Sequence, residues 1–509
     1  MLSITEGPMA SRILVICAAV IVTVTAVLTD MRMDLVAKPR NSASHDLIAY
    51  GALCDGVHDD TLAIQNWLNS IGSDVRLVAP PGVCVFSAPL QVPFANDWTI
   101  EGSGPYSTTL KYIGQASDVD LLTVSDARHG GFKDAFLGNL RIASDTRMRA
   151  GAALHVHGAF VSMFRNLVVG GFGDNDTLYD GFWFDGVGFA TLIGFDAKGR
   201  GDGVLVNAAQ GGTADLYLTS GRVGGFAIGL HVAGGMGGVQ CDQTDFLRNG
   251  INLKIDTTVK NAPNREIKQG PNCAFDSATT GDNVLIDDQL ANGGTIRLDG
   301  WIASSYHANG VHVAHWKNGD IELAGDALYN NCLDGIFISD ITTRIFISST
   351  LGIKSNGNAQ VGNGACGVVS SDRGWGVNAA SPTNRIYTDV RPWNNRAGSF
   401  APNAMIERLG PSGYRKHADG LIDYWGRVTL ADGEVSASIK DGDGNTPLCG
   451  GGWLAATLVG ALQTGRGSDR HVFPVVIAPS NDGLTFEVVG ARRVMQPSVI
   501  VWSGKCLPS

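Results

Sequence analysis

The sequence has few charged residues, and this limits the functions that it can serve. Only 17% of its 509 residues are Asp, Glu, Lys or Arg, against a usual quarter. The net charge is 38 − 48 = −10, with no Lys/Arg run, which argues against a nucleic-acid-binding protein. The chain also lacks CxxC, HExxH, P-loop and GxSxG motifs. We therefore expect no nucleotide site, no metal site and no nucleophilic serine.

Proline is scarce and glycine is abundant. The 18 prolines and the absence of a strict Gly-X-Y period exclude collagen. The 44% hydrophobic content and the ten Trp residues exclude a disordered chain. Glycine accounts for 67 of 509 residues, about 13% against a usual 7%. Together these features indicate a globular β protein with many short strands and tight turns.

The N-terminus contains one apolar run of 16 residues, from Ile13 to Leu28, which follows Arg12. It is shorter than the roughly 20 residues that span a membrane but suits the core of a signal peptide. We predict that residues 1–30 are a signal peptide or an uncleaved signal anchor. The alternatives are a buried N-terminal strand and a wrongly assigned start of the chain. The protein is expected to be secreted, periplasmic or at the cell surface, with membrane contact only through this segment.

Removal of the leader leaves an even number of cysteines, which permits disulfides in an exported protein. They are Cys54, Cys84, Cys241, Cys273, Cys332, Cys366, Cys449 and Cys506. We predict the pairs Cys54–Cys84 and Cys449–Cys506, because each pair brackets one region. For the four central cysteines, disulfides and buried free thiols both remain open.

A short pattern repeats through the middle of the chain: an apolar-x-apolar strand, often led by Gly after Asn or Asp. It recurs every 21–33 residues, at Gly181, Gly203, Gly229, Gly250, Asn283, Gly310, Gly335 and Gly367. This period and these turns are typical of the stacked turns of a parallel β-helix. A leucine-rich repeat fold is not favoured, because the LxxLxLxxN pattern is missing. A β-propeller is not favoured either, because its blades are longer than this repeat.

A helix is predicted just before the first strands, starting at Asp59 or Asp60. Its expected apolar face comprises Leu62, Ile64, Trp67, Leu68 and Ile71. Because an open solenoid end exposes apolar side chains and strand edges, a capping helix belongs there.

Residues 49–112 carry a recognisable opening. The segment AYGALCDGVHDDTLAIQNWLNS (49–70) is followed by a Pro-Pro-Gly turn and the stretch IEGSG. It resembles the start of pectate-lyase-superfamily proteins, often described as glycosyl hydrolase family 28-related. The resemblance implies a right-handed parallel β-helix that acts on carbohydrate. The family's polygalacturonase pattern of NxD, DD, GHG and RxK is not reproduced, so its active site does not transfer.

These observations predict an all-β protein. A right-handed parallel β-helix with an N-terminal capping helix is expected over residues 45–393. A linker follows over 394–420, and a small C-terminal β-sandwich over 421–509. The last segment is faintly similar to C-terminal domains of phage tail fibres.

Stacked turns are expected to line up the outward-pointing middle residues of the repeats at about 4.8 Å per turn. These are Trp183, Leu205, His231, Asn252, Leu285, His312 and Phe337. Such a surface suits sugar rings. The alternative is a sheet face covered by a loop or by a neighbouring subunit.

Glycoside hydrolysis needs two carboxyl groups that face one bond. The first candidates are Asp242 and Asp245, with Arg248 nearby. Asp299, Glu322 and Asp326, with His307, form the second group, although Glu322 is expected to pair with Arg297. Single Asp residues here can instead be turn residues. The predicted substrate-binding residues are Arg248, His231, His312, Trp183, His307 and Arg222.

The leading hypothesis is an exported glycoside hydrolase acting on an extracellular or cell-wall polysaccharide, without a cofactor. The alternatives are a polysaccharide lyase or epimerase, with Ca²⁺ possible for a lyase, and a carbohydrate-binding adhesin or phage tailspike-like protein. The protein is expected to be a monomer or a homotrimer.

Overall fold

The computed structural model describes residues 44–401, apart from short segments, and the backbone of several strands between residues 405 and 506. The segments left out before residue 402 are 126–130, 171–176, 208–214, 235–236, 257–265, 291–292, 326, 341–343, 349, 358–359, 362–363, 367–372, 382–383, 389–391 and 393. The predicted leader therefore lies outside the described residues. Within the described part of the chain, no helix is long and apolar enough to cross a membrane.

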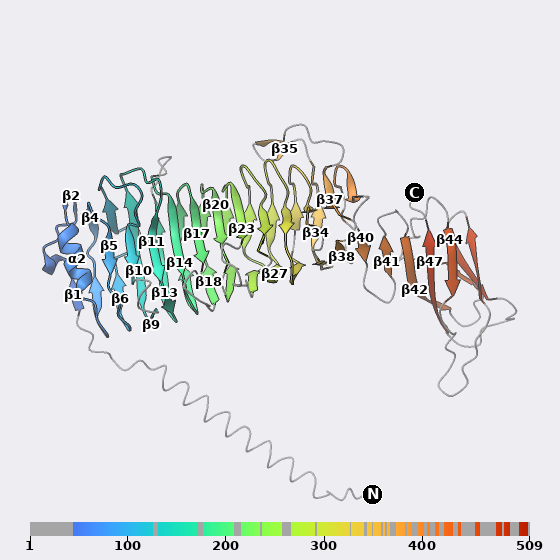
Figure 1. Cartoon of the computed structure of the whole chain (residues 1–509), viewed down its shortest axis with the longest axis horizontal. Coiled ribbons are helices and arrows are strands. Elements are labelled where there is room, and N and C mark those ends of the chain that lie inside the picture. Colours follow the sequence, from blue (N-terminus) through green and yellow to red (C-terminus); the bar gives the residue numbers. More distant parts are fainter. Residues whose placement is uncertain are drawn as a thin grey trace, which may run out of the picture.

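The chain winds into stacked turns, and their strands form three lengthwise ladders of parallel strands (Figure 1). We call these ladders face 1, face 2 and face 3. Face 1 is a separate 12-stranded sheet. Faces 2 and 3 form one hydrogen-bonded sheet, because strands β10 (Phe136–Ser144) and β13 (Met163–Val169) are long enough to belong to both. The protein is an all-β parallel solenoid.

The strand bounds are as follows. Face 1 contains β5 (Leu90–Val92), β8 (Leu122–Val124), β11 (Ala152–His157), β14 (Asp180–Asp185), β17 (Asp202–Asn207), β20 (Ile228–Val232), β23 (Ile251–Asp256), β26 (Val284–Asp287), β29 (Val311–His315), β32 (Ile336–Ile338), β37 (Trp375–Ala379) and β39 (Gly398–Phe400). Besides β10 and β13, face 2 contains β1 (Ser44–Asp46), β3 (Arg76–Val78), β6 (Thr99–Glu101), β15 (Ala190–Ile193), β18 (Asp215–Thr219), β21 (Gly238–Asp242), β24 (Glu266–Gln269), β27 (Gly294–Leu298), β30 (Gly319–Leu323), β33 (Arg344–Ile347), β38 (Arg385–Thr388) and β40 (Met405–Glu407). Face 3 adds β2 (Asp55–Asp59), β4 (Gly82–Phe86), β7 (Thr108–Tyr112), β16 (Asp196–Lys198), β19 (Arg222–Gly224), β22 (Asp245–Leu247), β25 (Ala274–Asp276), β28 (Trp301–Ala303), β31 (Ala327–Tyr329) and β34 (Gly352–Lys354).

Shorter pairs of strands lie outside the three faces. They are β9 (Phe132–Lys133) with β12 (Ala159–Phe160), and β35 (Gln360–Val361) with β36 (Gly364–Ala365). Strands β39 and β40 fall within the predicted linker 394–420, yet they still pair in parallel with β37 and β38.

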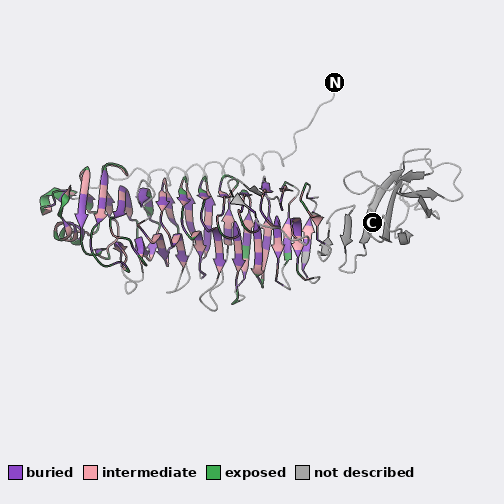
Figure 2. Ribbon diagram, turned by 90° about the horizontal axis from the view of Figure 1, so that it is seen from above, coloured by how far each residue is buried: buried purple, intermediate pink, exposed green. Residues whose placement is uncertain are grey.

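Stacked aliphatic and aromatic side chains form the core, and buried residues recur on every turn (Figure 2). One column, contributed by successive strands of face 1, contains Leu154, Phe182, Val204, Leu230, Leu253, Val284, Val311, Ile336 and Val377, all with at most 2% exposure. Full burial of such a side chain contributes about 1.5–3 kcal/mol. The alternation of apolar and polar residues therefore both fixes the fold and points every second residue outward.

Helix α2 (Thr61–Asn69) lies at the end of the solenoid where the first turns begin, beside the short 3-10 helix η1 (Leu47–Tyr50) (Figure 1). It starts at the predicted position and buries Ile64, Trp67 and Leu68. Leu62 was wrongly placed on the buried face, since it is 73% exposed. At 100° per residue it lies roughly 160° around the helix from Ile64. The capping role of α2 stays a prediction.

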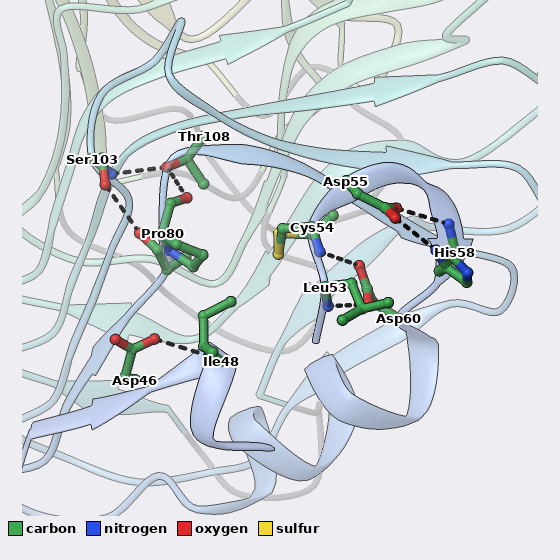
Figure 3. Close-up of a disulfide and its surroundings, with 12 residues drawn as sticks. Asp46, Ile48, Leu53, Cys54, Asp55, His58, Asp60, Pro80, Ser103 and Thr108 are labelled. Carbon is green, nitrogen blue, oxygen red and sulfur yellow. Dashed lines mark hydrogen bonds and ion pairs between the residues drawn. A yellow bond between two sulfur atoms is a disulfide. The ribbon is translucent and has the colours of Figure 1, made fainter. Parts of the chain in front are cut away.

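Asp60 stabilises the turn before this helix rather than the helix itself. Its carboxylate accepts hydrogen bonds from the amides of Leu53 and Cys54 at 2.7 and 3.0 Å (Figure 3). Cys54 forms a disulfide with Cys84, as predicted from sequence. Cys241–Cys273 and Cys332–Cys366 are also disulfides, so the four central cysteines are oxidised. The predicted pair Cys449–Cys506 lies outside the residues whose side chains are described.

Asn252 is the one member of the predicted outward column that was wrongly placed. It is fully buried, and Lys254 is in register with His231 instead. Asn252 belongs to a chain of side-chain amides that runs along the inside of one corner. Each amide NH₂ group donates to the next amide oxygen at 2.8–3.0 Å, in the order Asn249, Asn252, Asn283, Asn331, Asn356 and Asn395.

Beyond residue 412 the backbone pairs are antiparallel. The strands are β41 (Gly413–Lys416), β42 (Ile422–Leu430), β43 (Ser436–Ser438), β44 (Trp453–Leu458), β45 (Val475–Ser480), β46 (Gly483–Val488) and β47 (Ser498–Cys506). The predicted separation of residues 421–509 as a small β-sandwich stays a prediction.

Candidate functional site

The outward side of face 1 carries a continuous central column of side chains. In register from strand to strand these are His155, Trp183, Leu205, His231, Lys254, Leu285, His312, Phe337 and Asn378. Six of the seven residues predicted from sequence are therefore aligned as expected. The column thus combines imidazole, aromatic and aliphatic groups with Lys254 and Asn378 along one line.

Acidic side chains flank this column on both sides. Before the central residue lie Asp120, Asp180, Asp202, Asp282 and Asp334, and after it lie Asp185, Asp256 and Asp287. Eight carboxyl groups thus border a strip in which the described residues include the positively charged Lys254, Arg373 and His231. This is the highest concentration of interacting acids and histidines in the described part of the chain.

The first network on this face is built around His155. Its Nδ1 lies 2.7 Å from an oxygen of Asp120, and its ring stacks on Trp183 at 3.8 Å with an interplanar angle of 9°. His157, two residues further along the same strand, lies 3.5 Å from Asp185. Ligand atoms of His155, His157 and Asp185 all lie within 4.8 Å of one another. One other such group, Cys54, Asp60 and Cys84, includes a disulfide and so lacks thiolate ligands.

Asp180 lies beside this network and has an unusual acidity. Burial, together with the nearby charges of Asp202 and Asp120, raises the pKa of Asp180 to about 7. One oxygen of Asp180 accepts a hydrogen bond from the Asp202 amide at 2.6 Å, which opposes this rise without cancelling it. A carboxyl group that holds its proton near neutral pH can serve as a general acid.

His231 bridges two carboxylates. Its Nδ1 lies 2.7 Å from Asp202 and its Nε2 lies 3.0 Å from Asp256. Burial alone would lower the pKa of His231, but the two hydrogen bonds and the two negative charges raise it to about 9. The carboxylate of Asp256 also binds Lys254 at 2.6 Å. The imidazolium therefore fixes the position of Asp202 next to Asp180.

We expect this ionisation to make the protein more stable at pH 7 than at pH 10. The pKa of His231 rises from about 6.5 to about 9 on folding. The stabilisation is therefore complete below pH 6.5 and is lost as the pH rises through 9, and it amounts to about 3 kcal/mol. Urea unfolding between pH 7 and 10 measures it. His231→Asn should flatten the dependence, and an unchanged slope in that variant would contradict the assignment.

A second network lies further along the same face. Asp334 is fully buried, accepts hydrogen bonds from the amides of Gly374 and Trp375, and forms an ion pair with Arg373 at 2.9 Å. Burial raises the pKa of Asp334, although Arg373 opposes that rise. The Arg373 guanidinium lies 4.1 Å from the centre of the Phe337 ring.

His312 contacts this second network through the Phe337 ring, with 5.0 Å between the ring centres. It lies between Asp282 and Ser339, 2.9 Å from each. The second network is thus a set of satisfied contacts, and it supplies no group comparable to Asp180.

The carboxylates that we predicted to be catalytic lie on other faces. Asp242 ends β21 on face 2, and Asp245 begins β22 on face 3, so the two flank one corner. On face 2, Arg297 lies 3.6 Å from Glu322 and 3.8 Å from Asp299. These partly exposed pairs are worth about 0–1 kcal/mol, in line with the expected ion pair. The catalytic roles of these residues stay predictions.

The predicted basic residues are also dispersed. Arg222 binds Asp196 through two bonds of 2.6 and 3.3 Å, which raise the pKa of Arg222. Arg248 and His307 are exposed, in loops that follow β22 and β28. The predicted catalytic residue Asp326 lies outside the described residues. Of the predicted substrate-binding residues, only Trp183, His231 and His312 come together on one face.

The acids of face 1 are absent from the residues predicted from sequence, although the sequence contains a signal for them. Asp180, Asp202, Asp282 and Asp334 are the Asp residues that precede the repeat's Gly or Asn. An Asp at this position of the repeat is also typical of a turn residue. Their recurrence at the same point of the repeat places them in one column, and that periodicity was the signal.

No family model and no curated protein matches the chain, so the resemblance of residues 49–112 to pectate-lyase-superfamily proteins stays a prediction. Among solved structures, the A-module of the mannuronan C-5 epimerase AlgE6 from Azotobacter vinelandii is 14% identical. It covers 72% of this chain and 100% of its own, with a TM-score of 0.47. Geobacillus virus E2 ORF18 is 14% identical over 91% of this chain and 76% of its own, with a TM-score of 0.42. The gp42 tailspike of Acinetobacter phage vb_AbaP_AS12 is 13% identical over 82% and 70%, with a TM-score of 0.44.

Proposed function

We propose that this protein binds polysaccharide along the outward side of face 1 and cleaves it by glycoside hydrolysis. The observation that carries the proposal is the pair Asp180 and Asp202. Asp180 retains a proton near pH 7, whereas the Asp202 carboxylate is hydrogen-bonded to the His231 imidazolium. One carboxyl group is thus held in its protonated form, and the other is held as a carboxylate by a cation. Glycosidases use such a pair, in which one group acts as the acid and the other as the base or nucleophile.

In this mechanism Asp180 protonates the oxygen of the scissile bond. From the next turn of the solenoid, Asp202 activates a water molecule that attacks the anomeric carbon, or it attacks that carbon itself. In the second case Asp180, now ionised, deprotonates a water molecule that breaks the bond between Asp202 and the sugar. Adjacent turns lie about 4.8 Å apart, which favours the short carboxyl separation of about 5–5.5 Å typical of retaining enzymes. His155 covers one face of the Trp183 ring, so a sugar would contact its other face or its edge.

The charges on face 1 favour a neutral or amino-sugar polysaccharide over a polyuronate. Lys254, Arg373 and His231 each pair with an acid of the same face, and the remaining carboxyl groups would repel a uronate. A lyase or epimerase would need a cation available to the substrate carboxylate. That alternative is therefore less favoured than hydrolysis.

We also propose that the protein acts outside the cytosol. Three disulfides among the described residues are typical of proteins that fold in an oxidising compartment, which supports the export predicted from the leader. Whether the chain is a monomer or a homotrimer stays a prediction.

The deciding experiment incubates the full chain with a panel of neutral, amino-sugar and uronate polysaccharides. Reducing ends and ultraviolet absorbance of unsaturated products are both recorded. We expect saturated oligosaccharides from a neutral or amino-sugar substrate. Unsaturated products would identify a lyase, and binding without any product would identify a carbohydrate-binding protein. Either result would refute the hydrolase.

The pH profile provides a separate prediction. Because the pKa of Asp180 is about 7 and its protonated form is the active one, kcat/KM should fall about tenfold per pH unit above 7. Initial rates between pH 4 and 9 on the substrate found in the panel measure this. If kcat/KM instead begins to fall with rising pH already below pH 5, a group other than Asp180 is the acid.

A further inference from the structure

We infer that His155, His157 and Asp185 form a binding site for a first-row divalent transition metal, and we propose that this metal is Zn²⁺. No metal site is predicted from sequence, because the chain lacks the usual metal-binding motifs. The site is assigned from contacts on face 1 and does not depend on the proposed hydrolysis. Its three ligand residues lie on two adjacent strands, β11 and β14.

Strand geometry places the three side chains together. His155 and His157 are two residues apart on β11, so both point outward. Asp185 ends β14 and is the direct partner of His157 in the parallel register. The possible ligand atoms all lie within 4.8 Å of one another. Ligands about 2.0–2.1 Å from a tetrahedral Zn²⁺ are about 3–3.5 Å apart, so small side-chain rotations close the site.

Two buried atoms at this position lack partners. His155 is 4% exposed and Asp185 is 8% exposed. Nε2 of His155 and Oδ1 of Asp185 make no hydrogen bond to any residue that the structure describes. The large majority of buried side-chain polar atoms in proteins have a hydrogen-bond partner. A metal ion would satisfy both atoms at once, since each offers a lone pair.

The groups around His155 hold it in the form that binds metal. Its Nδ1 lies 2.7 Å from Asp120, and the other Asp120 oxygen accepts the Ala152 amide at 2.8 Å. Because a carboxylate only accepts, Nδ1 carries the proton of this hydrogen bond, and Nε2 is the ring nitrogen left to face a metal ion. A carboxylate behind a histidine is the usual support of a metal ligand. Stacking on Trp183 fixes the plane of the ring.

The ligand types select the metal. Two imidazole nitrogens and one carboxylate oxygen suit Zn²⁺ and its first-row neighbours, whereas Ca²⁺ and Mg²⁺ prefer oxygen ligands alone. Three protein ligands leave at least one coordination position open. The site thus differs from a closed structural zinc site and faces the surface that carries Trp183.

The test uses the untagged full chain, stripped with a chelator and with free thiols alkylated, so that neither a His-tag nor a cysteine binds metal. Zn²⁺ is titrated by calorimetry, and Co²⁺ is followed by visible absorption, which reports nitrogen and oxygen ligation. We expect one tight site per chain. Asp185→Asn and His157→Gln should each weaken it by about 100-fold or more, and Asp120→Asn by about 10–100-fold.

The matched control is His315→Gln. His315 lies 2.5 Å from Asp287 on the same face, as a His–Asp pair without a second histidine, and its loss should leave the tight site unchanged. Near-ultraviolet circular dichroism verifies that each variant is folded. Absence of a tight site in the folded full chain would overturn the inference. Equal affinity in the Asp185→Asn and His157→Gln variants would also overturn it.

Discussion

Asp180→Asn is expected to lower kcat for polysaccharide cleavage by about 10²–10⁴-fold, with little change in KM. The amide has the shape of the acid but has no proton to give to the leaving oxygen, and this range is typical for loss of a general acid. Steady-state kinetics on the substrate identified in the panel measure the effect. The thermal midpoint should stay close to that of the wild type, because the amide oxygen can still accept the Asp202 amide hydrogen bond.

Three further variants distinguish the Asp180 site from the alternative site at Asp242 and Asp245. Glu101→Gln, on face 2, removes an acid whose partner is Arg76, and it should retain full activity. Asp242→Asn and Asp245→Asn test the acids favoured by the sequence, and they should also remain active. If these two variants lose activity while Asp180→Asn keeps it, the site lies at the corner between faces 2 and 3.

Asn283→Ala is expected to destabilise the fold by about 3 kcal/mol. The Asn283 side chain donates to the Ala303 carbonyl at 2.6 Å and to Asn331 at 3.0 Å, and it accepts from Asn252 at 2.8 Å. Its loss leaves several buried polar groups without partners, each costing about 1–3 kcal/mol before relaxation. Urea unfolding followed by circular dichroism measures the shift in midpoint.

The control for this effect is Thr295→Ala, an exposed position on β27, where a change within about 0.5 kcal/mol is expected. Asn283→Asp adds a second comparison. It keeps the size of the side chain but removes both donated hydrogen bonds and buries a carboxylate, so it should be at least as destabilising as Ala at pH 7. If Asn283→Ala and Asn283→Asp are both as stable as the wild type, the chain of asparagine side chains does not stabilise the fold.

The misplacement of Asn252 shows where sequence patterns fail. In β23 the alternation of inward and outward residues holds from Leu253 to Asp256. Asn252 precedes that stretch at a corner of the solenoid, where other turns have Gly181 or Gly203. At Gly203 a Cβ would lie 2.2 Å from Val223. Asn252 occupies the same corner because its amide joins the buried hydrogen-bonded chain, which no single repeat reveals.

The sequence by itself determined the architecture. The repeat of 21–33 residues and the alternation within each strand predicted a parallel solenoid and aligned Trp183, His231 and His312 correctly. Each of these features is local, because side-chain direction follows from the two-residue period of a strand. The disulfide between Cys54 and Cys84 was predicted on a separate ground, since the two cysteines bracket one region.

Only the tertiary structure decided which polar groups meet. Turns of unequal length separate Asp120, Asp180 and His231 by dozens of residues, and their register depends on how successive turns stack. That stacking is set by the buried column from Leu154 to Val377, because a slip of one residue would turn apolar side chains outward. The acidity of Asp180 and the convergence of His155, His157 and Asp185 follow from this register, so neither can be predicted from any one repeat.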